Sequence, residues 1–316
     1  MLAVALVTAS DKDPVKTSAG VARKQVRQMT DEVETTIGAQ IARSREIIRQ
    51  YSVGFIGVDD ASVEQPSRSL GSGTLMQLAG VHGVLTAAHV AELLPRQERI
   101  GILRFRDGLM ESLVFPTTHL DVLMIGGGNS GEHGPDIAFV KLPPEAQATL
   151  QATNVFFSPD AHGERMLQRR GGSLGPVQAR FVAGVLDHFT EVLPARGNVY
   201  RMSFTSLTGW GEIVERGVTA DGFDWFEFAL IYEDGVIPPP TYGGVSGGSV
   251  WQLIDDTPPL HRNVIGVPFR ESNADANGHR RLICHGPKSI YEVLLPEVAK
   301  RWNLPAWEAW QAATDT

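Results

Sequence analysis

The chain of 316 residues contains a single cysteine, Cys284, which excludes a disulfide framework within the chain and a cysteine-rich zinc site. It has no apolar run long enough to cross a bilayer, so we predict no membrane-spanning helix and no membrane partner. Basic residues are in deficit, with 28 Lys and Arg against 36 Asp and Glu and a net charge of −8. Because nucleic-acid binding needs a basic surface, nucleic acid is not expected as a partner.

The first ten residues, 1–10, include a short apolar stretch but lack the basic segment with which a secretory signal begins. A cytoplasmic protein is therefore favoured over an exported one, and the lone cysteine is compatible with a reducing compartment. Glycine and proline, in contrast, are abundant, at 33 and 19 residues. They predict many turns and short strands, and hence an all-β fold in place of a helical bundle.

Hydrophobic periodicity divides the chain into four segments. In residues 1–50 a polar lead-in precedes apolar residues spaced by three, four or seven, which predicts a flexible and helical extension that covers the main domain or binds a partner. Residues 51–145 hold six or seven short apolar runs between turn signals, and residues 146–286 hold a second such set, so each predicts a β-barrel. Residues 287–316 return to helical spacing and predict a C-terminal helix.

Three short segments carry residues suited to acid–base and nucleophilic chemistry. His89 follows an apolar run and two alanines, whose small size lets the ring project from a strand end. Asp136 opens another apolar run after a glycine-rich loop, where a carboxylate at the edge of a core needs a donor such as a histidine ring N–H. Ser246 is flanked by four glycines. Each segment alone is also explained by a core or surface histidine, a turn-capping aspartate or a glycine-rich turn.

The glycines around Ser246 permit backbone angles that other residues resist. They allow the amides of Gly244 and Ser246 to point at one spot, as an oxyanion hole requires, and a Cβ at position 244 would intrude on the approaching carbonyl. His89 and Asp136 belong to the first β-set and Ser246 to the second, so we expect a site in the cleft between the two sets.

In these residues the chain resembles the trypsin/chymotrypsin-like serine peptidases, over about residues 50–295. The motifs that carry the resemblance are Gly71-Ser-Gly-Thr74, Leu85-Thr-Ala-Ala-His89, Asp136-Ile-Ala-Phe-Val-Lys-Leu142, Gly244-Val-Ser-Gly-Gly248 and Val264-Ile-Gly-Val267. The resemblance implies two packed six-stranded Greek-key β-barrels of the chymotrypsin type. It also implies a serine endopeptidase that hydrolyses peptide bonds of a protein or peptide substrate, with no metal and no organic cofactor.

The resemblance assigns a role to each residue of a catalytic triad. Ser246 would attack the scissile carbonyl and form an acyl-enzyme. His89 would take the serine proton and deliver it to the leaving amine, while Asp136 would fix the histidine tautomer and stabilise the imidazolium. The amides of Gly244 and Ser246 would bind the oxyanion.

The chain departs from the secreted animal members of that family. Val245 stands where those enzymes carry an aspartate that pairs with a freshly cut N-terminus, and the chain cannot form their disulfides. Residues 1–50 are an additional segment. These differences predict a bacterial, disulfide-free relative that folds in an active form or is switched by a regulatory protein partner.

Alignment with the family gives candidates for the pocket that selects the substrate side chain. Pro240 and Thr241 would form its base, and the walls would be Phe269-Arg270-Glu271 and Cys284-His285-Gly286. Glu271 would favour a basic substrate side chain and Arg270 or His285 an acidic one, while solvated rim charges are the plainer explanation.

Two other functions stay open. The segment Gly244–Gly248 also matches the Gly-x-Ser-x-Gly elbow of α/β-hydrolase esterases. The acid and base would then come from Asp255, Asp256, Asp275, His279 and His285. That fold requires strands alternating with long helices, which residues 51–240 do not predict. The other alternative is a catalytically silent binding or regulatory module, which Val245 and the altered pocket suggest.

Overall fold

The computed structural model describes residues 42–58, 67–106, 109–127, 131, 133–159, 177–196, 199–232, 235–254, 261–305 and 307. The chain divides into two compact units, Met1–Ser44 and Arg45–Thr316, and the β-structure belongs to the second. Of the predicted extension over residues 1–50, residues 1–41 lie outside the described residues, as do residues 308–316 at the other end. No helix in the described part of the chain has the length and apolarity needed to cross a membrane.

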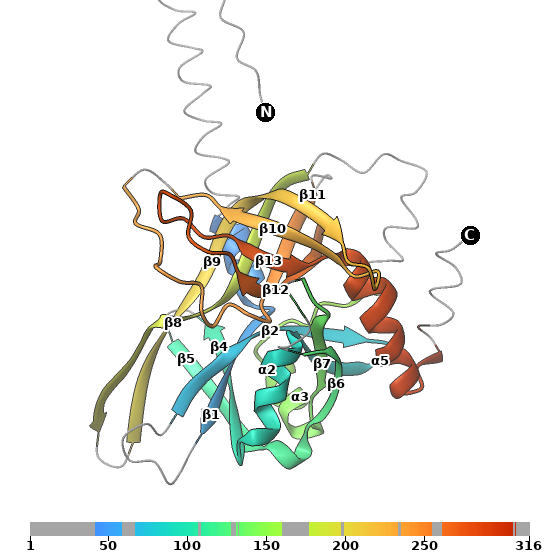
Figure 1. Ribbon diagram of the computed structural model, residues 1–316. Coiled ribbons are helices and arrows are strands. Elements are labelled where there is room, and N and C mark those ends of the chain that lie inside the picture. The colour runs from blue at the N-terminus through green and yellow to red at the C-terminus, as the bar shows by residue number, and fades with distance from the viewer. Residues whose placement is uncertain are drawn as a thin grey trace, which may run out of the picture. The chain divides into compact units, whose positions relative to one another are not determined.

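The first β-set forms a curled antiparallel sheet of seven strands (Figure 1). Its strands are β1 (Ser52–Val58), β2 (Ser67–Leu78), β3 (Val81–Thr86), β4 (Arg99–Arg106), β5 (Leu109–Pro116), β6 (Asp121–Gly126) and β7 (Asp136–Lys141), in the order β5-β4-β1-β2-β3-β7-β6. The two edge strands, β5 and β6, are consecutive in the chain and are joined through the short 3-10 helix η2 (Thr117–His119) and Leu120. A link of this length spans at most about 14 Å. The end of β5 and the start of β6 must therefore lie close together, which requires the sheet to curl.

This sheet corrects the prediction of a closed six-stranded first barrel. The additional strand arises at Pro116, which ends β5 because proline has no N–H to continue a ladder. The turn at η2 then separates β5 from β6, and the two strands occupy opposite edges of the sheet.

The second β-set is a closed six-stranded barrel, as predicted for this half of the chain. Its strands are β8 (Val177–Arg196), β9 (Val199–Val218), β10 (Asp224–Leu230), β11 (Ser249–Ile254), β12 (His261–Glu271) and β13 (Leu282–His285), in the order β10-β13-β12-β11-β8-β9. Its core contains Phe226, Phe228, Val245, Val250 and Cys284. Every pair of neighbouring described strands in both sheets is antiparallel.

Helices are short and peripheral. Besides η2 and the helical residues 42–49, the described helices include α2 (Ala88–Leu93) with η1 (Leu94–Arg96), α3 (Pro144–Gln151), and the C-terminal pair η3 (Ser289–Leu294) and α5 (Leu295–Arg301). The C-terminal pair confirms the predicted C-terminal helix. It buries Ile290, Leu294 and Val298, which share one helical face. Beyond α5, the indole N–H of Trp302 donates to Asp121 at 2.7 Å, so the chain leaving the barrel is fastened to β6 of the curled sheet.

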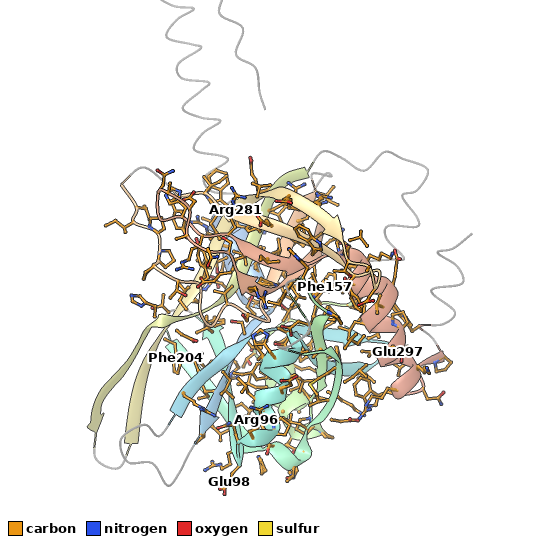
Figure 2. All side chains as sticks on the ribbon, in the orientation of Figure 1. Arg96, Glu98, Phe157, Phe204, Arg281 and Glu297 are labelled. Atoms are coloured by element: carbon orange, nitrogen blue, oxygen red, sulfur yellow. The ribbon has the colours of Figure 1, made fainter. Side chains whose placement is uncertain are left out.

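The barrel and the sheet are joined by buried contacts near the middle of the molecule. The Val185 amide of β8 donates to the hydroxyl of Ser72 on β2 at 2.7 Å. Phe157, labelled in Figure 2, packs edge-on against Trp251 of β11, with ring centroids 5.4 Å apart, and its amide donates to Leu75 of β2. A closed barrel fastened to a curled sheet is compatible with a chymotrypsin-like fold.

Candidate active site

His89 lies at the start of α2, directly after β3. Ala87 and Ala88 are fully buried, so only residues without a bulky side chain fit at the turn from strand to helix. The His89 side chain is 30% exposed and projects from this turn. The amide of His89 is one of the N–H groups that a helix start leaves without an intrahelical acceptor. Asp136 supplies the acceptor, because its Oδ1 takes this N–H at 2.8 Å.

Asp136 contacts His89 a second time, through the ring. Its Oδ2 lies 2.7 Å from His89 Nδ1, and the carboxylate is only 8% exposed. Both carboxylate oxygens are therefore used on one residue, which fixes the ring relative to the helix. Because Nδ1 donates to the carboxylate, the neutral ring keeps its lone pair on Nε2, the state needed in a general base.

The loop that carries Ser246 is a pair of tight turns before β11. Gly244 and Gly247 have φ values of +87° and +84°, in the left-handed region where a side chain is strained. The Val245 side chain is fully buried in the barrel core and anchors the loop. The amides of Gly244 and Ser246 donate to no acceptor among the described residues, so both are available to a bound oxyanion.

The serine loop is fastened to the segment that leads to His89. The Ser72 amide donates to the Ser246 carbonyl at 2.8 Å, and the Thr86 hydroxyl donates to the Ser72 carbonyl at 2.7 Å. A Cβ placed on Gly247 would lie 2.1 Å from Thr86 Oγ1, so the loop lies directly against the end of β3. The Ser246 hydroxyl itself donates to the Phe269 carbonyl at 3.4 Å and makes no hydrogen bond to His89.

The candidate pocket residues divide into two groups. Thr241 Oγ1 and the Tyr242 amide donate to the carboxylate of Glu271, at 2.9 and 2.6 Å, and Arg280 pairs with the same carboxylate at 3.4 Å. The Pro240 carbonyl accepts from Arg280 at 3.0 Å. Glu271 therefore holds the chain before the serine loop in place.

The exposed side chain of Arg270 and that of Glu271 line a polar cavity of about 630 Å³. The other residues that line it are His133, Glu227, Ser272, Asn273, Asp275, His279, Arg281 and Ile283. Arg281, labelled in Figure 2, is paired with Glu227 at 2.8 Å. The cavity thus carries charges of both signs.

Phe269 and His285 form the second group and are buried behind Asp136. Their rings are stacked, with centroids 4.3 Å apart and planes inclined by 16°. The sequence suggested His285 as a pocket wall, but its side chain has no exposed surface. Its Nε2 instead accepts the Asp136 amide at 2.9 Å.

Asp187 on β8 is a neighbour of the serine loop that no sequence motif indicates. Its amide donates to the Gly243 carbonyl at 2.8 Å, and a Cβ on Gly244 would lie 2.2 Å from its Oδ1. Desolvation against the loop raises the pKa of the Asp187 carboxyl. Asp187 therefore occupies the space that any side chain at position 244 would need.

Comparison with known proteins gives no closer identification. No family model and no curated protein matches the chain. Among solved structures it is similar to a chain described under "Aromatic interactions drive the coupled folding and binding of the intrinsically disordered Sesbania mosaic virus VPg protein". The identity is 13%, the match covers 75% of this chain and 87% of that chain, and the TM-score is 0.36. A likeness at this level assigns no function.

Proposed function

We propose that the chain is a serine endopeptidase of the trypsin/chymotrypsin type. Ser246 Oγ forms a bond to the scissile carbonyl carbon while its proton passes to His89 Nε2, and the carbonyl oxygen becomes an oxyanion facing the amides of Gly244 and Ser246. Collapse of this intermediate breaks the C–N bond, and His89 gives the proton to the leaving amine. Water, activated by the same histidine, then hydrolyses the acyl-enzyme.

The observation that carries this proposal is the double attachment of Asp136 to His89. A capping aspartate needs only the backbone N–H, but this carboxylate also takes the ring Nδ1–H, at 2.7 Å. The second contact fixes the tautomer and orientation of an imidazole at a partly exposed position. Orientation of this kind is what a general base requires and a surface histidine does not.

Strand order gives further support for the chymotrypsin type. Starting from the first strand, the curled sheet runs β1-β2-β3-β7-β6 and continues on the other side of β1 as β4-β5, with β5 and β6 linked in the chain. The barrel runs β8-β9-β10-β13-β12-β11. In each unit, counted along the chain, the third strand pairs with the last: β3 with β7 in the sheet and β10 with β13 in the barrel. Two units that repeat one strand order are expected for paired Greek-key barrels.

The resting position of Ser246 keeps a second function under consideration. Its hydroxyl donates to the Phe269 carbonyl, which is the arrangement expected if the site is silent and the protein serves as a binding or regulatory module. Catalytic hydrogen bonds are often long in free enzymes and shorten with substrate, so the same arrangement suits a resting peptidase. The esterase alternative has less support, because its parallel sheet does not occur among the described strands.

Labelling with a fluorophosphonate reporter separates these functions. We expect the full chain to label on one serine, Ser246→Ala to lose labelling, and His89→Ala to label more slowly by several orders of magnitude. Matched controls are Ser206→Ala, on β9, and His119→Ala, an exposed histidine paired with Glu145 at 2.9 Å. Both should label at the wild-type rate.

The proposal fails if the folded wild-type chain never labels under conditions in which a trypsin control does. Normal labelling of His89→Ala would refute the assignment of the base. Circular dichroism of each variant separates loss of activity from loss of fold. Cleavage of a peptide library by the labelling-competent protein then tests endopeptidase activity itself.

A further inference from the structure

His285 is a fully buried histidine at the end of β13, and its ring is clamped on two sides. Phe269 stacks on the ring with 4.3 Å between centroids. On another side lies Gly134, where a Cβ would be 2.2 Å from His285 Cε1. The ring therefore has no room to turn, and its nitrogen atoms point in fixed directions.

One of those nitrogen atoms meets the backbone of Asp136. The Asp136 amide donates to His285 Nε2 at 2.9 Å, inside the protein. An imidazole nitrogen that accepts a hydrogen bond carries no proton, so His285 is neutral with its proton on Nδ1. The bond crosses from the barrel to the curled sheet, since His285 belongs to β13 and Asp136 begins β7.

The Asp136 amide has no other acceptor supplied by the sheet. In the β6–β7 ladder Asp136 is the last paired residue, opposite Gly126. Without His285 this buried N–H would be unpaired, which is unfavourable in a protein interior. A shift of the Asp136 backbone toward another acceptor would also move its carboxylate, whose two oxygens are hydrogen-bonded to His89.

We propose that His285 is a positioning residue for the triad, whose Nε2 holds the Asp136 backbone so that both carboxylate oxygens reach His89. This role rests on the proposed function, because it concerns the geometry of the same site. The stack with Phe269 extends the connection, since the Phe269 carbonyl is the acceptor for the Ser246 hydroxyl. The buried His285 ring thus contacts the backbone of Asp136 and the side chain of Phe269, the residue whose carbonyl accepts from Ser246.

Side-chain replacements at position 285 test this role, because glutamine and asparagine imitate different nitrogen atoms of histidine. His285→Gln places an amide group at the position of Nε2 and can still accept the Asp136 N–H. His285→Asn places its amide near Nδ1, and His285→Phe keeps the ring but has no acceptor. We expect labelling to slow on the order of tenfold to a hundredfold in the Phe and Asn variants, as for other residues that orient a functional side chain from behind. Gln should restore most of the rate.

A second measurement is independent of catalysis. The His89 Nδ1 proton, in a 2.7 Å bond to Asp136, is expected to give a far-downfield proton NMR resonance. We expect this resonance to shift or broaden in His285→Phe and His285→Asn and to persist in His285→Gln. His82→Phe is the matched control, because His82 is another buried histidine but is paired with Gly80 and Gln151 and not with Asp136. It should leave the resonance and the labelling rate unchanged.

The proposal is overturned if folded His285→Phe or His285→Asn keeps the wild-type resonance and labelling rate, or if His285→Gln behaves like them. If His285→Phe does not fold, the comparison of Gln with Asn decides. Failure of the proposed function is a different result: no variant labels, wild type included, while the resonance still reports whether His285 positions Asp136.

Discussion

At the scale of single residues, the site depends on hydrogen bonds made by the buried Asp136 to one partly exposed and one fully buried histidine. The Asp136 carboxylate and amide make three such bonds, to His89 twice and to His285 once. Each is short, and removal of His89 or His285 leaves a buried group of Asp136 without its partner. The cost of leaving one such group without its partner is larger than the net stabilisation that the hydrogen bond provides.

The buried His285 predicts a specific acid sensitivity. Burial lowers the pKa of His285 to about 4 from its ordinary 6.5, against the opposing effects of Asp136 and Asp224 and with a small contribution from His133. As the pH falls, the imidazole of residue 285 is therefore protonated in the unfolded chain before it is protonated in the folded protein. The stabilisation is complete above pH 6.5 and is lost as the pH falls through about 4, an effect of about 3 kcal/mol.

Urea unfolding at several pH values checks this expectation. Between the two pKa values, the wild-type free energy of unfolding should fall by about 3 kcal/mol more than that of His285→Gln, which has no proton to bind at this position. Carboxylates shared by both proteins cancel in the comparison. Equal losses in the two proteins would show that the pKa of His285 is not lowered in the folded protein.

At the scale of elements, a glycine in the serine loop and a glycine between β12 and β13 share a left-handed backbone but differ in surroundings. Gly244 has φ +87° and faces Asp187, whereas Gly278 has φ +80° and no atom within 4 Å of a Cβ. Alanine at either position pays the left-handed backbone strain, about 1–2 kcal/mol. Only at position 244 does the new methyl group also displace the loop.

We therefore expect Gly244→Ala to abolish fluorophosphonate labelling while Gly278→Ala labels at the wild-type rate. Thermal unfolding should show similar strain in both variants, with a further loss for Gly244→Ala. Undiminished labelling of Gly244→Ala would mean that the amide of residue 244 is not part of the oxyanion site.

Sequence patterns identified most elements, because a strand or helix is encoded in neighbouring residues. Apolar runs predicted β3, which ends shortly before His89, and β7, which begins at Asp136, and helical spacing predicted the C-terminal helix. Patterns did not reveal that β5 and β6 become the two edges of a curled sheet, because the pairing and closure of a sheet depend on distant partners. They misplaced His285 for the same reason: its acceptor role links residues 149 positions apart through a backbone amide, which leaves no mark on composition or spacing.

At the scale of the whole molecule, one small residue connects the barrel, the curled sheet and the serine loop. Ser72 on β2 is fully buried. Its hydroxyl donates to the Gly244 carbonyl at 2.6 Å and accepts the Val185 amide of β8 at 2.7 Å. Its own amide donates to the Ser246 carbonyl. The proposed triad, drawn from two β-units, would keep its geometry only while such contacts fix one unit against the other.

Ser72→Ala should consequently affect both stability and activity. The Gly244 carbonyl and the Val185 amide would each lose a buried partner, and at about 1–3 kcal/mol for each unpaired group the variant should unfold well below wild type. Labelling should slow as well, because the Gly244 carbonyl is no longer held.

Ser249→Ala is the control: this serine is equally buried, but its hydroxyl has no partner among the described residues. Its loss should be nearly neutral. The contrary result is that Ser72→Ala and Ser249→Ala have the same free energy of unfolding and the same labelling rate. That result would mean that apolar packing alone holds the two β-units together, and that the hydrogen bonds of Ser72 do not set the geometry of the site.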